Sequence, residues 1–116
     1  MRSFSSALNN VDLRAFPREQ VNRRAKVIGG PFAVDAWIKN ISLGGALLSY
    51  PGRTVCGDDV VLIDLETATA YACKVAWRKG PECGVRFVKS QDLRGLVSGQ
   101  FDLARQVYQA AVRGAA

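Results

Sequence analysis

The stretch that decides the fold class is AYACKVAWRKGPECGVRFV, residues 70–88. Apolar and polar side chains alternate through residues 72–77 and again through residues 84–87, and the turn-forming sequence Lys79-Gly80-Pro81-Glu82 separates the two runs. Alternation with a period of two places successive side chains on opposite faces of a strand, and glycine with proline favours a tight reversal of the chain. The stretch therefore predicts an antiparallel hairpin with one face in a hydrophobic core, and we expect Trp77 and Phe87 on that core face.

Four further segments before this hairpin are short, rich in β-branched and aromatic residues, and separated by glycine and proline. Together with the hairpin they make six expected strands, which are Arg24–Ile28, Ala33–Asn40, Gly45–Ser49, Asp59–Leu65, Ala70–Trp77 and Gly84–Val88. So small a sheet would leave exposed edges unless it closed on itself. We therefore predict an all-β fold with a C-terminal helix, in which six antiparallel strands form a closed or nearly closed barrel.

The C-terminal part of the sequence changes to a helical pattern. Apolar residues recur every three or four positions from about Gln91 to Arg113, which predicts one amphipathic helix or two with a break near Gly99. We expect this helix to cover an open end of the barrel; the alternative is a partner-binding or dimer-forming face. The expected organisation is a flexible arm over residues 1–17, a barrel over residues 18–90 and a helix packed on the barrel over residues 91–116.

Composition limits the possible functions. The 116 residues suit one domain, and 48% of them are apolar, as expected for a soluble globular protein. The sequence contains no histidine, which excludes Ser-His-Asp and Cys-His catalysis and histidine-ligated zinc. The acidic residues near the fourth expected strand are interpreted as solvated rather than catalytic; they are Asp58, Asp59, Asp64 and Glu66. We therefore expect no enzyme activity, no metal and no cofactor.

The cysteines and the N-terminus indicate the compartment. Cys56, Cys73 and Cys83 are odd in number and lack the spacing of a zinc site, which is typical of free thiols in a reducing environment. Residues 1–10 lack the apolar run of a signal peptide, and no apolar stretch is long enough for a membrane span. A cytoplasmic protein is expected.

The net charge of +6 is concentrated at both ends of the chain. Residues 1–30 contain six basic and two acidic residues, and residues 78–116 contain seven and three. Such an excess favours an anionic partner. The first basic group holds Arg18, Arg23 and Arg24, whose planar forks can bind phosphate oxygens and the O6/N7 edge of guanine, although the group could also be a solvated linker.

A polar corner follows the second expected strand, in the sequence Asn40-Ile41-Ser42-Leu43-Gly44-Gly45. Asn40 and Ser42 are two residues apart, so their short polar side chains can point the same way, and Gly45 permits close approach of a ligand. A corner of this kind can contact the polar edge of a ligand. It can equally be a turn that caps a hairpin.

These features in this order resemble the PilZ domain family of bacterial cyclic-di-GMP receptors. The resemblance covers about residues 17–90 and rests on the arginine group, on N-x-S-x-x-G at Asn40, Ser42 and Gly45, and on Val75-x-Trp77 and Gly84-Val85-x-Phe87. It implies a PilZ-like split barrel whose ligand, cyclic-di-GMP, is bound by Arg18, Arg23, Arg24, Asn40, Ser42 and Gly45.

The arginine spacing departs from the R-x-x-x-R pattern of the family. Arg18 and Arg23 are one residue too far apart, and the register that makes Arg24 the second arginine places Gln20 first. Either the arm bulges by one residue, so that Arg18 and Arg23 act together, or the first arginine has been lost. Glutamine carries no charge and cannot replace a guanidinium.

Three functions follow from this interpretation. In the first, cyclic-di-GMP orders residues 14–24 against the barrel and the new surface engages an unidentified downstream protein. In the second, a PilZ-like adaptor has lost the nucleotide and works through protein contacts alone. A small barrel that binds nucleic acid is the least favoured, because the sequence lacks a solvent-facing row of aromatic residues.

Overall fold

The computed structural model describes residues 17–30, 32–50 and 57–115. The arm expected over residues 1–17 therefore lies outside the described residues apart from Pro17. Cys56 also lies outside them.

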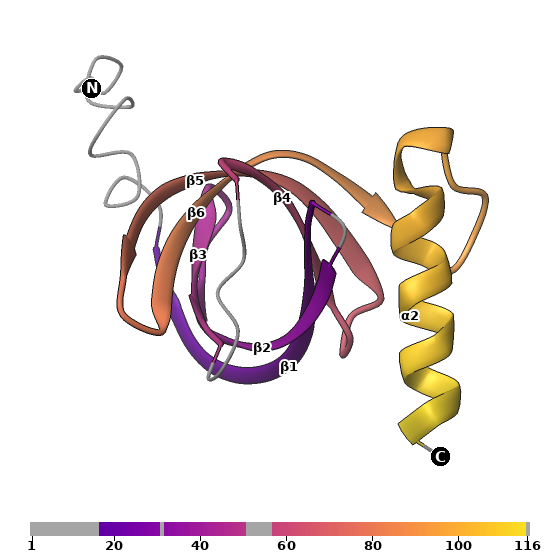
Figure 1. The fold of residues 1–116 in the computed structure, drawn as a ribbon, viewed down its shortest axis with the longest axis horizontal. Helices are drawn as coiled ribbons and strands as arrows, with labels where there is room; N and C mark the ends of the chain where they lie inside the picture. Colours follow the sequence, from indigo (N-terminus) through magenta and orange to yellow (C-terminus); the bar gives the residue numbers. More distant parts are fainter. Residues whose placement is uncertain (1–16, 31, 51–56, 116) are drawn as a thin grey trace.

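Six antiparallel strands close into a barrel (Figure 1). The strands are β1 (Glu19–Gly29), β2 (Phe32–Ile41), β3 (Gly45–Ser49), β4 (Asp59–Asp64), β5 (Thr69–Lys79) and β6 (Glu82–Asp92). Their order around the barrel is β1-β2-β3-β6-β5-β4, and β4 pairs with β1 to complete the ring. The predicted fold class, six antiparallel strands with a C-terminal helix, is confirmed.

The barrel interior is an apolar core made by every second residue of the strands. On β4, for example, Val60 and Leu62 are buried inside, while Val61 and Ile63 face outward. Two of the interior residues are free cysteines, Cys73 and Cys83. Burial raises the pKa of the Cys73 thiol to about 12, so this side chain remains a neutral, small hydrophobic group.

Trp77 does not lie in the interior, contrary to expectation. The β5–β6 register shifts between Val75 and Trp77, so Trp77 pairs with Gly84 and its indole is 42% exposed. A Cβ atom on Gly84 would come within 2.2 Å of the indole nitrogen, so glycine is what allows the ring to lie there. The irregular register moves this tryptophan off the core face that simple alternation predicts.

The C-terminal helix packs against the outer wall of the barrel. A short 3₁₀ turn, η2 (Gly99–Phe101), leads into α2 (Asp102–Ala115), and Figure 1 shows α2 beside the wall. Phe101 and Ala104 are buried against the outward-facing side chains of Ile63 and Ala70, and together they form a second core outside the barrel. The expected position over an open end is therefore wrong. The outer faces of β4 and β5 are themselves apolar, and burying them stabilises the helix where it lies.

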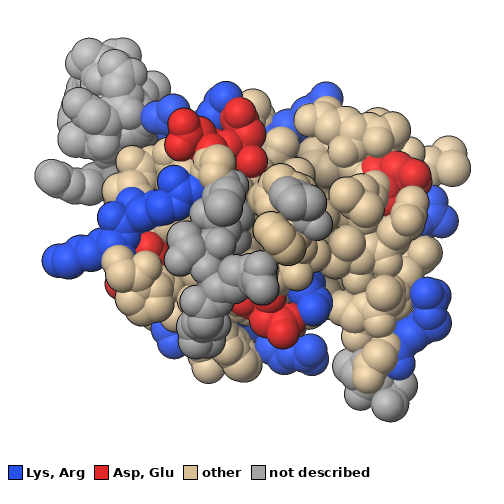
Figure 2. All heavy atoms as spheres, viewed as in Figure 1, with Lys and Arg blue, Asp and Glu red and all other residues tan. Residues whose placement is uncertain are grey.

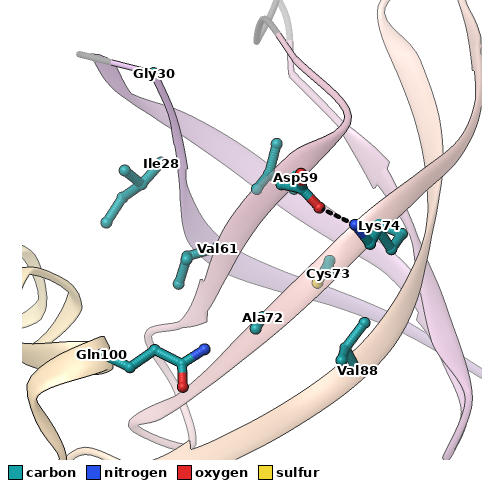
Figure 3. Close-up of a pocket in the computed structure, with 10 residues that line it drawn as sticks. Ile28, Gly30, Asp59, Val61, Ala72, Cys73, Lys74, Val88 and Gln100 are labelled. Carbon is teal, nitrogen blue, oxygen red and sulfur yellow. Dashed lines mark ion pairs between the residues drawn. The ribbon is translucent and has the colours of Figure 1, made fainter.

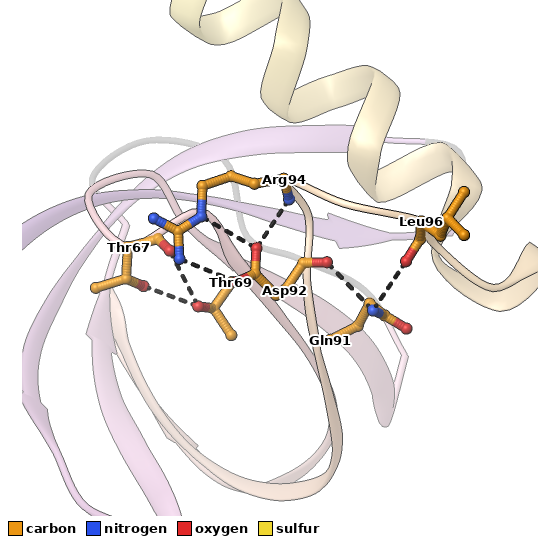
Figure 4. Close-up of polar contacts among 6 residues, drawn as sticks. All are labelled: Thr67, Thr69, Gln91, Asp92, Arg94 and Leu96. Atoms are coloured by element: carbon orange, nitrogen blue, oxygen red, sulfur yellow. Dashed lines mark hydrogen bonds and ion pairs between the residues drawn. The ribbon is translucent and has the colours of Figure 1, made fainter.

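The link between β6 and α2 is held by polar contacts (Figure 4). Asp92, the last residue of β6, binds the guanidinium of Arg94 at 2.9 Å, and Gln91 Nε2 donates to the carbonyl oxygen of Leu96 at 3.3 Å. Helical structure begins at Gly99 rather than near Gln91, because Gln91 and Asp92 still pair with β5. None of the described helices has the length and apolar character that crossing a membrane requires.

Candidate functional site

A bulge in β1 lies between Arg18 and Arg23. Gln20 pairs with Asn40 and Arg23 pairs with Ile38, so β1 has one residue more than β2 between these two positions. Side chains alternate along a strand, and one bulged residue makes a five-residue step equivalent to a regular step of four. Arg23 continues the series of Ala25 and Val27 that faces the barrel interior, and the bulge lies between Arg23 and Arg18. A bulge at this position is one of the two explanations that the spacing of Arg18 and Arg23 allows.

Arg18 contacts the polar corner directly. Its Nη1 donates a hydrogen bond to Oδ1 of Asn40 at 3.3 Å, across 22 residues of sequence. Asn40 is 8% exposed and is one of two buried polar or charged residues among those described. The structure therefore brings together one arginine of the expected arm and the asparagine of the corner, at the end of the barrel where β1 begins and β2 ends.

Arg23 is bound to a buried carboxylate. Its Nη1 donates to Oδ2 of Asp64 at 2.9 Å, and the Asp64 side chain is fully buried. The other oxygen of Asp64 accepts hydrogen bonds from the backbone N–H groups of Glu66 and Thr67. The hydrogen bond that Arg23 donates to Asp64 raises the pKa of the Arg23 guanidinium, which stays charged. Asp64 was expected to be solvated, and this is wrong, because it lies on the face of β4 that carries Val60 and Leu62.

Arg24 lies on the opposite side of the wall. It is exposed, it follows Arg23 directly along the strand, and it lines two grooves together with Ala111 of α2. Its backbone N–H lies 3.4 Å from Oε2 of Glu66. Arg23 and Arg24 therefore lie on opposite faces of β1.

Ser42 is used by its own turn. Its hydroxyl oxygen accepts hydrogen bonds from the backbone N–H groups of Gly44 at 3.1 Å and Gly45 at 3.3 Å. Gly45 begins β3 and pairs with Arg86 of β6, and the N–H of Phe87 donates to the carbonyl oxygen of Gly44. In this structure Ser42 shapes the turn, as the simpler interpretation of the corner had it, while Gly44 and Gly45 join the turn to β6.

Two stacked rings lie next to this turn, and sequence analysis did not assign them to a site. The rings of Tyr71 and Phe87 are 4.1 Å apart between centroids and inclined by 14°. They line a hollow of about 360 Å³ together with Ser42, Leu43, Val88, Lys89 and Ser90. Burial raises the pKa of Tyr71, the charge of Asp64 raises it further, and the charge of Arg23 lowers it. The sequence signal for the inward position of Tyr71 was that Tyr71 lies two residues before Cys73 on β5.

The largest hollow described lies elsewhere, and none of the six expected ligand residues lines it (Figure 3). Its floor includes outward-facing Val61 and Ala72, and the ion pair of Lys74 with Asp59 lies at its edge. Figure 2 shows basic groups spread around one face of the molecule with acidic groups between them. That face has no continuous basic tract of the kind that phosphate-driven nucleic-acid binding uses.

Comparison with known proteins agrees with this geometry. The sequence profile of the PilZ domain family matches residues 12–98, which is most of the chain. The comparison with curated proteins gives no match. PilZ domains in general bind cyclic-di-GMP as receptors or adaptors rather than as enzymes. With a profile match of this extent and a barrel of the expected form, the chain belongs to the PilZ domain family.

Proposed function

We propose that this protein is a cyclic-di-GMP receptor whose working arginines are Arg18 and Arg23. The observation that carries the proposal is the one-residue bulge between Gln20 and Arg23, because it offsets the extra residue between the two arginines. Asn40, hydrogen-bonded to Arg18, completes the polar surface. Of the other three residues of the expected site, Ser42 and Gly45 act by shaping the turn beside it, and Arg24 lies on the opposite face of β1 from Arg23.

The chemistry of the ligand suits these side chains. Cyclic-di-GMP carries two phosphate charges and two guanines, and a guanidinium can bind either group through paired N–H donors. Among the described residues, the Arg23 side chain has one hydrogen-bond partner, Asp64, and that contact uses a single nitrogen. The guanidinium has five N–H donors, so the others can reach a ligand at the end of the barrel. Neither a metal nor a cofactor is needed in this scheme.

Binding would transmit a signal through the chain segment before β1. Glu19–Arg24, part of the segment expected to become ordered, already belongs to β1, so ligand-dependent ordering would involve the residues that precede Glu19. A ligand that binds the ordered form better shifts the population toward it by its difference in affinity. The ordered segment would then engage a downstream protein.

One observation favours a second candidate, an adaptor that does not bind the nucleotide. Arg23 already has an anionic partner in Asp64, and this carboxylate is fully buried. A ligand that drew Arg23 away would leave a buried negative charge without compensation. In the adaptor, the ion pair would serve only the stability of the barrel.

Calorimetric titration with cyclic-di-GMP decides between the two. We expect the wild type to bind, and the double variant Arg18→Ala/Arg23→Ala to bind at least about 100-fold more weakly, because each arginine contributes charge-assisted hydrogen bonds. Arg24→Ala is the control, since it removes one positive charge from the position next to Arg23, on the opposite face of β1. Absence of wild-type binding at micromolar ligand would favour the adaptor, and equal losses in Arg24→Ala and the double variant would show that the effect is one of general charge.

A further inference from the structure

We propose that the uncovered part of the outer barrel wall beside α2 is a contact surface for a second copy of this chain. In the proposed dimer, Leu103 of each copy enters the hollow of about 480 Å³ on the other copy. Neither this hollow nor Leu103 belongs to the expected nucleotide site, so the proposed dimer does not depend on the binding of cyclic-di-GMP.

An apolar row crosses the outer wall at the floor of the hollow (Figure 3). Ile28 of β1 pairs with Val61 of β4, and Val61 pairs with Ala72 of β5, so these three residues lie side by side. Val88 continues the row on β6, where this strand has one residue more than β5, and its side chain is 64% exposed. Four neighbouring strands thus carry outward-facing apolar side chains at one level of the barrel.

The next row of the same wall is covered, whereas this row is not. Ile63 and Ala70, two residues further toward the β4–β5 turn, pair with each other and are fully buried. Phe101 and Ala104 of the segment that begins α2 cover them. The row that contains Val61 is only partly buried. A strand that is apolar on both faces needs cover on both, and covering the open row would remove apolar surface from water.

Leu103 is an exposed apolar side chain on the flank of α2 that faces the open row. Residues three, four or seven positions apart lie on the same side of a helix. Gln100, three residues before Leu103, lines the hollow, and Ala110, seven residues after it, lines the groove that Lys26 borders on β1. Lys26 lies two residues before Ile28, on the same outer face of β1. A projecting side chain, 55% exposed, and a hollow therefore lie next to each other on one surface.

A surface that carries a projection beside a hollow is complementary to itself. In a two-fold symmetric contact, the same patch of each copy meets the other, so each Leu103 can enter the hollow of its partner. The charges agree with this arrangement. Asp59 and Lys74, the charged residues that line the hollow, form an ion pair and leave it without net charge. The chain has a net charge of +6, so two copies can approach closely only through a neutral surface, whereas a strongly charged partner would find no opposite charge here.

Sedimentation velocity of the nucleotide-free protein over a range of concentrations tests this assignment. We expect a monomer–dimer equilibrium, with a dissociation constant that Leu103→Asp and Val88→Asp each raise at least about 100-fold, because each places an unpaired charge in an apolar contact. Both side chains are more than half exposed, so neither substitution enters the barrel core.

Val112→Asp is the matched control on the same helix. Val112 is also an exposed apolar residue, but it follows Leu103 by about two and a half turns and so lies on the opposite flank, where it lines a groove with Leu65. The dissociation constant of this variant should stay within about threefold of the wild-type value, as for a surface change away from the contact.

Cross-linking identifies which residues meet across the contact. In a Cys56→Ser background, in which Cys73 and Cys83 are buried, a chain with Leu103→Cys is mixed with a chain with Val88→Cys and treated with a short bis-maleimide. We expect a cross-linked heterodimer from this mixture and none when Val112→Cys replaces Leu103→Cys.

Two results would overturn the proposed surface. One is a wild type that stays monomeric at about 1 mM, and the other is a dimer that Leu103→Asp and Val88→Asp leave as stable as Val112→Asp does. Neither result bears on cyclic-di-GMP binding, which calorimetry measures separately.

Discussion

The two faces of β1 carry two ion pairs in contrasting environments. On the inner face, Arg23 binds Asp64 at 2.9 Å, and the carboxylate is fully buried. On the outer face, Lys26 binds Asp35 at 2.6 Å, and the carboxylate is 85% exposed. The distances are similar and the basic side chains are equally exposed, at 25%. Because the contact lengths are similar, we expect the environment of the acid to determine how much each ion pair contributes to stability.

The same contrast separates two neighbouring arginines. Arg23 and Arg24 are adjacent in sequence, but alternation sends one toward the barrel interior and the other toward α2. A basic cluster that looks continuous in the sequence is therefore divided between two surfaces.

The largest effect is expected from removing the inner carboxylate. Asp64→Ala leaves the Arg23 guanidinium without its partner and two backbone N–H groups of the following turn without an acceptor, so we expect a loss of about 2–3 kcal/mol in the free energy of unfolding. Asp35→Ala should change it by less than about 0.5 kcal/mol. Chemical denaturation of both variants measures the difference, and equal losses would contradict the comparison.

The next largest effect is expected in how salt changes the coupling energies of the inner and the outer ion pair. Double-mutant cycles of Arg23 with Asp64 and of Lys26 with Asp35 give the two coupling energies. We expect about 1–2 kcal/mol for the inner pair, with little change between 0.05 M and about 1 M salt, and no more than about 0.5 kcal/mol for the outer pair, lost at high salt. The reason is that ions in solution screen exposed charges and cannot surround Asp64. An inner coupling that disappears with salt would show that water reaches this pair.

Much of the fold could be predicted because alternation and turn residues are local signals. The six strands and the hairpin around Gly80 follow from them. The outer position of α2 was not predicted. The sequence of β4 already indicated a strand that is apolar on both sides, with Val61 and Ile63 on one face and Val60 and Leu62 on the other. Such a strand needs cover on its outer face as well as its inner one.

The candidate site was harder to predict from the sequence, because irregular strand pairing changes which residues lie opposite one another. The extra residue between Gln20 and Arg23 exists only relative to β2, and the sequence of β1 alone does not show where the partner strand lacks a counterpart. The burial of Asp64 could have been predicted, because Asp64 continues the inward-facing series of Val60 and Leu62. The stacked pair of Tyr71 and Phe87 joins two strands whose register also shifts nearby, so the two rings could not be paired in advance.

Deleting the bulge tests whether it is what brings the two arginines together. Without Asn22, the step from Arg18 to Arg23 becomes four residues, and a regular strand then places both on one face. We expect stability to change by less than about 1 kcal/mol and affinity for cyclic-di-GMP to stay within about threefold. An alanine inserted after Asn22 is the control, because it turns Arg18 to the other face and should weaken binding as Arg18→Ala does. If deletion and insertion are equally harmful, the bulge has another role.

The smallest effect is expected at the pair of Asp92 with Arg94, which is exposed and local. Hydrogen bonds from the Arg94 side chain and backbone lower the pKa of Asp92 to about 2. A carboxylate with a lowered pKa contributes stability above the pKa of the unfolded chain and loses it as the pH falls through 2, but only if the unfolded chain lacks the interaction. These residues are two positions apart, so the unfolded chain can form much of the same contact. Carboxyl NMR titration should therefore show the low pKa in the native protein and its return toward 3.8 in Arg94→Ala, while the free energy of unfolding at pH 5 stays at the wild-type value. A loss comparable to that of Asp64→Ala would mean that exposure does not separate these pairs.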